Sequence, residues 1–465
     1  MNTANFESIH IMIDAQVWRN LPLHLRLYHA FRQLVISGAL VDGAKLPSAR
    51  ALAQQLRLSR DTVENAYSQL QRDGFMTRRQ GAGSFASRQG IPHIQGQHSL
   101  PPSPRQTPTL SARWQTIADR AVSFDARRVQ TFTLGLAETR NFPQIIWQNF
   151  ARQIQRERAH TLMLHGDPQG EPELRQQIAH YLNFERGAKV DAQQIVIVSG
   201  ARQAFSAAQL NLLPIEVDRD GIRVDKLPPA PLVYVTPSHQ FPSGHLLSLA
   251  RRHALIDWAR THNTWIIEDD YDSEFHYNGA PVACMQGLDR EQRTLYVGTF
   301  SKTLYPGLRI GYLVVPASLA AHFAAARNLL DGATPALTQL TLARFIASGH
   351  FAAHIRTMRS MYAVRQACLA QAINQHLSDW VTPVVTPGGL QMPCWLHEGI
   401  DEQQTLNAAR RAGLNIAGMR QFWLTHPAPT GWLLGFAAFT PYEIENGVKL
   451  LRAALCAENA RQAGS

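Results

Sequence analysis

The sequence predicts an α/β protein with a small N-terminal winged helix-turn-helix, a large α/β domain and a small C-terminal α+β lobe. Two short helices with serine caps, followed by a basic hairpin, predict the first part. A stretch rich in Pro, Gln, Gly and Ser separates this part from the rest. Beyond it, short apolar runs alternate with helical stretches, which is typical of βαβ units around a mostly parallel sheet.

The length and composition of the chain limit the possibilities. With 465 residues the chain is too long for one compact core, so two or three domains are expected. A formal net charge of +10 favours a polyanionic partner such as nucleic acid. The four cysteines lie far apart, without the spacing of a metal or redox site, and are expected to be reduced thiols. No signal peptide and no bilayer-spanning apolar run is visible, so we expect a cytoplasmic protein.

The helix-turn-helix prediction is based on residues 46–87. Ser48 is expected to cap one helix and Ser59 a second, with a short turn between them. The stretch "FMTRRQGAGSFAS" that follows predicts a two-stranded wing carrying Arg78 and Arg79. A generic three-helix bundle with a basic, solvated surface is the alternative interpretation.

This module resembles the winged helix-turn-helix of the GntR family over about residues 20–87. The resemblance implies a promoter-DNA partner, with arginines and the wing on phosphates and the first turn of the second helix on bases. We expect DNA contacts from Arg50, Ser59, Arg60, Thr62, Arg78, Arg79 and Gly81. Arg50 could instead be a surface charge of its helix. Glu64 stands where some relatives carry a second basic residue, so the DNA sequence that is read should differ.

The linker prediction begins at residue 88. The stretch "RQGIPHIQGQHSLPPSPRQTPTL" shows no apolar period and cannot bury enough surface to offset its ordering entropy. We therefore expect a DNA-binding module over residues 15–87, a linker over 88–125 and an effector domain over 126–465.

Five apolar runs predict the sheet of the large domain. They are residues 195–200, 232–237, 265–270, 294–300 and 309–315. Such continuous apolar runs are typical of strands covered by helices on both faces. From about residue 318 the pattern becomes helical, and residues 380–460 mix short strands with helices, as in a smaller α+β lobe.

Lys302 stands between two of these runs, in "TFSKTLYPGLRIG". A lysine at the end of a parallel strand points into the crevice where α/β sheets bind ligands. Asp269 and Tyr271 are two residues apart and would share one face of a strand. The carboxylate could keep a pyridine nitrogen protonated, and the phenol could bond a ring hydroxyl. A plainer alternative is that Asp269 caps a strand end.

Groups suited to a phosphate surround this lysine. They are Gly200, Ala201, Thr299, Ser301 and Arg309. The glycine and alanine end a strand and open a helix, so their N–H groups could bind an anion, and the guanidinium and hydroxyls could complete the site. Arg309 could instead pair with Glu268.

These motifs together resemble a known architecture. Residues 130–460 resemble a fold-type-I pyridoxal-phosphate (PLP) aminotransferase, and the whole chain resembles the MocR subgroup of GntR regulators. "IEDDYDSEF", "TPSHQFPSG" and "GTFSKTLYPGLRIGY" match that subgroup. The resemblance implies that Lys302 is the Schiff-base lysine, Asp269 the pyridinium partner and Tyr271 a contact of the ring hydroxyl, with the phosphate bound by the groups named above. It also places His239 or Gln240 near the ring and implies a homodimer.

Two departures from the family stand out. After Leu213 the chain runs directly into "PIEVDRDGIRVDKL", and a strand-helix unit of roughly 30 residues, with an aromatic that stacks on the cofactor ring, is missing. A natural deletion, a sequence error and an engineered change all fit. We expect a weakened domain and a lower cofactor affinity. Leu433 stands near the arginine with which aminotransferases bind a substrate carboxylate, which argues against ordinary transamination.

The sequence therefore predicts a PLP-responsive, DNA-binding transcriptional regulator. Its effector domain would sense PLP or an amine or amino-acid metabolite through Lys302, as a sensor rather than an enzyme. Two alternatives remain: a DNA-binding repressor with a degenerate, cofactor-free sensor domain, and an active aminotransferase.

Overall fold

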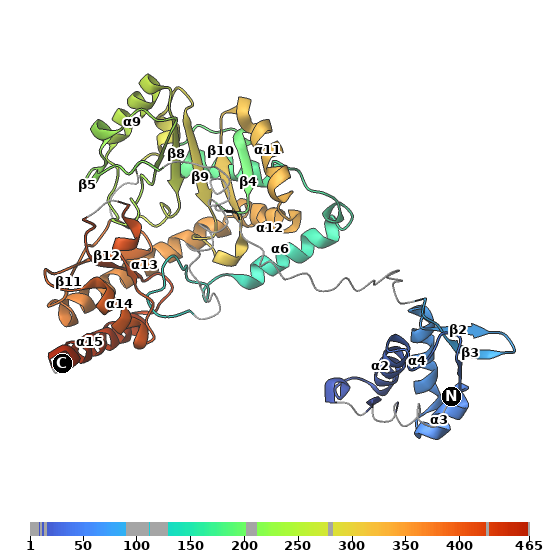
Figure 1. The fold of residues 1–465 in the computed structure, drawn as a ribbon. Helices are drawn as coiled ribbons and strands as arrows, with labels where there is room; N and C mark the ends of the chain where they lie inside the picture. Colours follow the sequence, from blue (N-terminus) through green and yellow to red (C-terminus); the bar gives the residue numbers. More distant parts are fainter. Residues whose placement is uncertain are drawn as a thin grey trace. The chain divides into compact units, whose positions relative to one another are not determined.

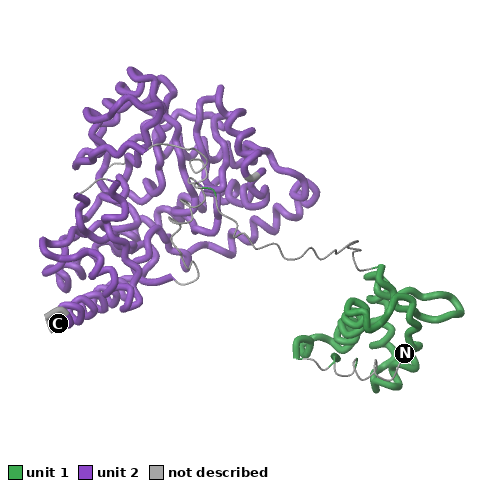
Figure 2. The backbone as a smooth tube through the Cα atoms, viewed as in Figure 1, with its two compact units in different colours: residues 1–123 green, residues 124–465 purple. Residues whose placement is uncertain are grey.

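The chain forms two compact units, residues 1–123 and 124–465 (Figure 2). The structure, a computed structural model, describes residues 9, 12–13, 16–89, 111, 129–200, 212–277, 282–424 and 427–463. Within these residues, none of the helices has the length and apolar character needed to cross a membrane.

The first unit contains the expected winged helix-turn-helix. Its elements are η1 (Gln16–Trp18), α2 (Leu23–Ile36), β1 (Lys45–Leu46), α3 (Ala49–Leu56), α4 (Arg60–Arg72), β2 (Met76–Arg79) and β3 (Gly83–Ala86). Both predicted caps are present: the Ser48 hydroxyl accepts the N–H of Ala51 at 3.2 Å, and that of Ser59 accepts the N–H of Thr62 at 3.1 Å. Strands β2 and β3 form the wing, and β1 joins its outer side in the order β1-β3-β2.

The apolar stripes of α3 and α4 meet in one core. The buried side chains on these helices are Leu52, Ala53, Leu56, Val63, Ala66, Tyr67 and Leu70, as the 3.6-residue period predicts. Helix α2 packs across α4 and contributes to the same core. The polar faces of both helices are thereby left at the surface.

The second unit is built on a five-stranded sheet. Its strands are β4 (Ile195–Val198), β7 (Leu232–Val235), β8 (Trp265–Asp270), β9 (Thr294–Thr299) and β10 (Gly311–Val314). All five predicted runs form strands. Their order is β4-β10-β9-β8-β7, in which β7, β8 and β9 are parallel and β10 is antiparallel to both neighbours.

Helices cover both faces of this sheet (Figure 1). On β4 the two isoleucines enter one core with α7 (Pro172–Glu185) and α12 (Ala336–Ala347), whereas the two valines enter another with α11 (Ala317–Asp331). Helix α9 (Leu249–His262) packs against β7 and β8 in a third cluster. Burial of both faces explains why the strands appear as continuous apolar runs in the sequence.

The C-terminal lobe follows the long helix α13 (His350–His376), as Figure 1 shows. Its elements are β11 (Val381–Pro383), β12 (Gln391–Leu396), α14 (Glu402–Arg411), β13 (Ala417–Gly418), β14 (Gly431–Gly435) and α15 (Pro441–Ala463). The strands form an antiparallel sheet in the order β11-β12-β14-β13, and α13 packs against α15. The predicted α+β lobe is therefore present.

Between β4 and β7, where we expected a strand-helix unit to be missing, the described part of the chain adds no strand to the main sheet. In the described part of the chain between β4 and β7, the only strands are the two-residue strands β5 (Val217–Asp218) and β6 (Gly221–Ile222). Among the described strands, β7 forms an edge of the main sheet. Tyr234 on β7 is 49% exposed.

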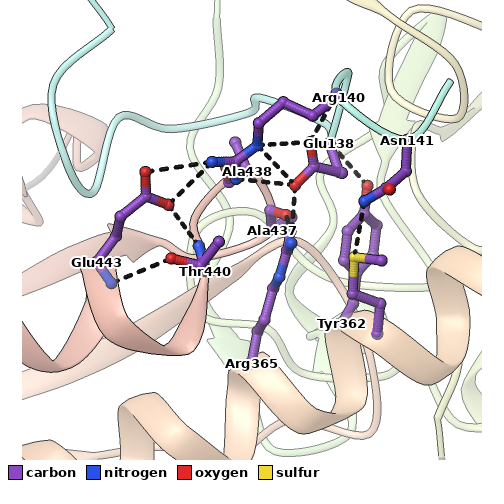
Figure 3. Close-up of polar contacts among 10 residues, drawn as sticks. Glu138, Arg140, Asn141, Tyr362, Arg365, Ala437, Ala438, Thr440 and Glu443 are labelled. Atoms are coloured by element: carbon purple, nitrogen blue, oxygen red, sulfur yellow. Dashed lines mark hydrogen bonds and ion pairs between the residues drawn. The ribbon is translucent and has the colours of Figure 1, made fainter.

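A buried ionic network ties the chain before α6 (Gln144–Glu157) to the C-terminal lobe (Figure 3). Glu138, which is 1% exposed, accepts hydrogen bonds from Arg140 at 2.9 Å and from Arg365 of α13 at 2.7 Å. Arg140 also reaches Glu443 of α15 at 3.2 Å. Burial raises the pKa of Glu138, but the bonds from both guanidinium groups outweigh it and lower the pKa to about 2.

Candidate cofactor pocket and nucleic-acid interface

The sheet brings the predicted site residues together at one end of its strands, where β4 and β9 terminate. Gly311 of β10 lies opposite Val198 on one side and Thr299 on the other, so three strands are in register there. Gly200 and Ser301 each follow these positions by two residues. They therefore lie beside each other although about 100 residues separate them in the sequence.

The Lys302 side chain lines a cavity of about 420 Å³ at this end of the strands. The cavity is lined by Leu134, Gly135, Tyr234, Thr236, Gln240, Phe241, Asp269, Tyr271, Lys302, Leu390, Gln391 and Phe422. The Lys302 ammonium donates a hydrogen bond to the carbonyl oxygen of Gly135 at 2.7 Å. Gly135 has a φ of +67°, and a Cβ atom there would lie 2.2 Å from Nζ of Lys302, so this wall of the cavity requires glycine.

The Asp269 carboxylate has no cationic partner among the residues that the structure describes. Its Oδ2 atom accepts a hydrogen bond from the Tyr234 hydroxyl. Its Oδ1 atom is shielded from solvent, and no described residue bonds to that atom or pairs a positive charge with the carboxylate. Burial raises the pKa of Asp269 to about 6; the Tyr234 hydroxyl opposes this shift, and the charges of Asp270 and Asp272 add to it.

The adjacent Asp270 lies on the opposite face of β8 and is paired. Its Oδ2 atom accepts hydrogen bonds from Arg186 at 2.9 Å, Ser273 at 2.8 Å and Tyr296 at 2.6 Å. Burial raises the pKa of Asp270, but the charge of Arg186 and these hydroxyls lower it below its usual value. The alternation of side chains along a strand thus gives two neighbouring acids different environments.

Tyr271 lines the cavity, although β8 ends one residue before it. Its hydroxyl donates to the carbonyl oxygen of His239 at 3.0 Å, and burial raises its pKa well above the usual value, so the phenol stays neutral. The His239 ring is instead held by Asp272 at 2.8 Å and does not line the Lys302 cavity. Burial lowers the pKa of His239, but Asp272 outweighs this effect and raises it. Gln240, the other residue expected near the ring, does line the cavity.

The groups expected to hold a phosphate lie at the same end of the strands. A Cβ atom on Gly200 would lie 3.2 Å from Nη2 of Arg309, so the guanidinium lies directly against this glycine. The Thr299 hydroxyl accepts the N–H of Ser301 at 3.2 Å, and the Ser301 hydroxyl is shielded without a partner among the described residues. Ala201, and the helix expected to begin there, lie outside the described residues.

The alternative pairing of Arg309 with Glu268 does not form. Both carboxylate oxygens of Glu268 accept backbone N–H groups, from Met285 at 2.9 Å and Gln286 at 3.0 Å, and its nearest guanidinium is that of Arg252 at 4.0 Å. Burial raises the pKa of Glu268 to about 7. Arg309 makes no ion pair with any residue that the structure describes and remains available to an anion.

Sequence reasoning missed part of the cavity wall. The missed residues are Leu134, Gly135, Tyr234, Thr236, Phe241, Leu390, Gln391 and Phe422. Tyr234 could have been found from the alternation of side chains, because it pairs with Ile267, which shares a face of β8 with Asp269. Thr236 lies in the same run as Tyr234, and Phe241 in the motif "TPSHQFPSG". The remaining residues come from distant segments without a local signal, and they are Leu134, Gly135, Leu390, Gln391 and Phe422. Leu433 is fully buried in β14, and none of the described residues lining the cavity is an arginine.

The arginines among the predicted DNA contacts lie at the surface of the first unit. Arg50, Arg60 and Arg79 are exposed, and Arg79 lies over the Phe85 ring at 5.2 Å. Gly81 turns the wing tip with a φ of +76° and faces open space.

Three of the expected contacts are already engaged with neighbouring side chains. The hydroxyls of Ser59 and Thr62 bond each other at 2.7 Å. Arg78 on the wing pairs with Glu64 at 2.6 Å.

Comparisons with known proteins agree with this architecture. A family model described as bacterial regulatory proteins of the gntR family matches residues 23–85, and one described as aminotransferase class I and II matches residues 222–392. The probable rhizopine catabolism regulatory protein MocR of Rhizobium meliloti is 31% identical over 468 residues, with 94% of each chain covered. The pyridoxine biosynthesis transcriptional regulator PdxR of Corynebacterium glutamicum is 29% identical, with 89% of this chain and 91% of PdxR covered.

Solved aminotransferase structures share the fold of the second unit. A kynurenine aminotransferase from Pyrococcus horikoshii, in complex with PMP, superposes with a TM-score of 0.66 at 23% identity and covers 77% of this chain and 97% of its own. The α-aminoadipate aminotransferase LysN from Thermus thermophilus gives a TM-score of 0.67 at 21% identity, with 76% and 100% covered.

Proposed function

Because this chain belongs to the MocR-type GntR transcriptional regulators, we propose that its aminotransferase-like domain binds PLP and that the bound state controls promoter binding by the winged helix. The observation that carries the proposal is the meeting of Lys302 and Asp269 in one cavity, where Asp269 has no cation among the described residues. The DNA-binding role itself is the role that the family and its N-terminal module share.

The residues present fit PLP in their chemistry. A shielded carboxylate without a cation favours a ligand that brings a protonated nitrogen, because an uncompensated charge at low dielectric is costly. Lys302 supplies the primary amine for the PLP aldehyde, and Arg309, Ser301 and the backbone at Gly200 supply anion-binding groups at the same end of the strands. When bound, PLP would supply an electrophilic carbon that links reversibly to amines.

Each cavity residue then has a distinct role. Lys302 would hold the ligand covalently, Asp269 would hold its ring nitrogen, and Tyr271 would orient the ring through a neutral hydroxyl. Thr299, Ser301, Arg309, Gly200 and, beyond the described residues, Ala201 would hold the phosphate. Gln240 lies at the ring end of the cavity, whereas His239 would act through its contact with the Tyr271 hydroxyl.

The two departures from the family favour a sensor over an enzyme. Leu433 is buried in a sheet and no described cavity residue is an arginine, so a substrate carboxylate lacks its usual partner. The missing unit also removes a stacking aromatic, and we expect PLP affinity to be lower than in complete relatives. An effector without a carboxylate, or PLP itself, fits this pocket better than an α-amino acid.

The DNA-binding module would be carried by a flexible linker. We propose the boundaries 15–87 for the module, 88–125 for the linker and 126–465 for the effector domain. The contacts proposed for DNA are those of Arg50, Ser59, Arg60, Thr62, Arg78, Arg79 and Gly81. We further propose that the protein acts in the cytoplasm as a homodimer, in which the effector domains fix the spacing of two modules. Met163 and Leu329, 87% and 89% exposed, are apolar surface that a second copy could cover.

The proposal is tested by reducing the PLP-loaded protein with borohydride and mapping the adduct by mass spectrometry. We expect a pyridoxyl group on Lys302, visible absorption before reduction, and a change in operator affinity on adding PLP. Lys302→Ala should lose the adduct, and Arg60→Ala should lose DNA binding while keeping the adduct. An unmodified Lys302 peptide at saturating PLP would favour the cofactor-free repressor, and amino-acid turnover that is lost in Lys302→Ala would favour the aminotransferase.

A further inference from the structure

An ion pair crosses the surface that should face DNA. Nη1 of Arg78, on strand β2 of the wing, lies 2.6 Å from Oε1 of Glu64, and the two side chains are 37% and 42% exposed. Glu64 lies one helical turn after Arg60 on α4, so both side chains project from the same side of the helix that enters the major groove. The pair therefore joins the recognition helix to the wing at the point where both should meet DNA.

This ion pair reduces the positive charge that the wing presents to DNA phosphates. Arg78 and Arg79 are neighbours on β2, but only Arg78 is neutralised by a carboxylate, whereas Arg79 rests on the Phe85 ring and has no ion pair among the described residues. An exposed ion pair contributes little to stability, so a good alternative partner can open it. On arbitrary DNA, Glu64 removes one cation from the surface and adds an anion that repels phosphates.

We propose that Glu64 is a specificity-determining residue of this DNA-binding module. It lowers the affinity for arbitrary DNA by holding Arg78, and in the operator it accepts a hydrogen bond from the N4 amino group of a cytosine. A carboxylate can only accept hydrogen bonds, and in the major groove cytosine presents an amino donor at N4, whereas adenine places the acceptor N7 beside its N6 amino group. Opposite a guanine or thymine edge, which presents acceptors at this level, the carboxylate would be left without a partner. When Glu64 turns to the cytosine, Arg78 is released to a phosphate.

The test uses the full chain with Glu64→Ala, Arg78→Ala and the double variant. Affinity for a random-sequence duplex is measured by fluorescence anisotropy over a salt series, and preferred sites are selected from a random library for each protein. Glu445→Ala is the matched control, because Glu445 and Lys449 of α15 also form an exposed pair at 2.6 Å but lie outside the DNA-binding unit. Thermal melting of each variant confirms that it is folded.

We expect Glu64→Ala to bind the random duplex about threefold more tightly at moderate salt and to steepen the salt slope by about 0.9, the effect of one added phosphate contact. Adding Arg78→Ala to this variant should abolish the gain. Sites selected by the unaltered protein should contain a cytosine whose preference falls about tenfold in Glu64→Ala.

Two results would overturn the proposal. If Glu64→Ala changes neither the random-duplex affinity nor the selected sites, the pair is only a surface ion pair. If Glu64→Ala weakens binding to all sequences equally, Glu64 merely supports the wing. Neither reading depends on PLP, so the result is separate from that of the borohydride experiment.

Discussion

Glu138 and Asp269 are both carboxylates that the second unit removes from water, but their surroundings differ. Both oxygens of Glu138 accept hydrogen bonds from arginines, and the network reaches three segments of the chain (Figure 3). Asp269 has one tyrosine hydroxyl and no described cation. Accordingly, the pKa of Glu138 is lowered to about 2, despite burial, and burial raises that of Asp269 to about 6. The full compensation of Glu138 fits a structural role, whereas Asp269 combines incomplete compensation with a place in the Lys302 cavity and is therefore a candidate partner of a ligand.

Removing the Glu138 carboxylate, which two arginines neutralise, should have the largest effect on stability. Glu138→Ala leaves Arg365, which is 4% exposed, as a buried charge without its carboxylate. We expect the free energy of unfolding of the effector domain to fall by about 3–5 kcal/mol in urea denaturation. Glu445→Ala, which breaks an exposed and solvent-screened pair, should change the free energy of unfolding far less. A loss as small as that of the control would show that the network does not hold the lobe.

A third carboxylate, that of Glu268, extends the comparison to the pH dependence of stability. It is buried, and its nearest guanidinium lies 4.0 Å away. Burial raises its pKa from 4.5 to about 7, so between these values the folded state holds a proton that the unfolded state releases. The free energy of unfolding should therefore fall as pH rises through this window, by about 3 kcal/mol from this group. Urea denaturation at pH 4.5 and 7.5 should show a smaller loss in Glu268→Gln. Equal losses in both proteins would contradict the assignment.

Removing the uncompensated charge should have a smaller effect of opposite sign. Asp269→Asn keeps an acceptor for the Tyr234 hydroxyl but removes the carboxylate charge, and we expect the unliganded protein to gain about 1–2 kcal/mol at pH 8. The gain should shrink at pH 5, where Asp269 is largely protonated because burial raises its pKa to about 6. Equilibrium denaturation of both proteins at the two pH values measures this.

The same variant should bind PLP more weakly, because the ring nitrogen loses its charged partner. A titration followed by visible absorption should show an affinity lower by about tenfold or more. Lower stability combined with unchanged PLP affinity would place Asp269 with the structural acids.

Much of the fold could be predicted because its signals are local. The serine caps, the apolar stripes of α3 and α4 and the wing hairpin lie within a few residues of one another, and each structured element matches its prediction. The five strands were visible because burial on both faces demands continuous apolar runs. The gap expected after Leu213 had a different basis, because it rests on the family resemblance and stays a prediction.

The partners of the buried charges could not be predicted. Lys302 and Gly135 are separated by 167 residues, and Glu138 and Arg365 by 227, so their meeting depends on how strands and helices pack. Sequence alternation placed Asp269 and Asp270 on opposite faces, but it could not tell which face carries an arginine. His239 or Gln240 was expected near the cofactor ring, and the sequence could not show that the His239 imidazole bonds Asp272 while Gln240 lines the cavity.

The sequence alone determined the elements of both units and the candidate lysine, because backbone propensity, capping and hydrophobic period act between residues that are near in the chain. Only the tertiary structure decided which charges are neutralised, since pairing in a low-dielectric interior depends on distances of a few ångströms between groups from distant segments. The sequence therefore could not show that the pKa of Glu138 is lowered and that of Asp269 is raised, because this difference depends on their surroundings in the folded protein.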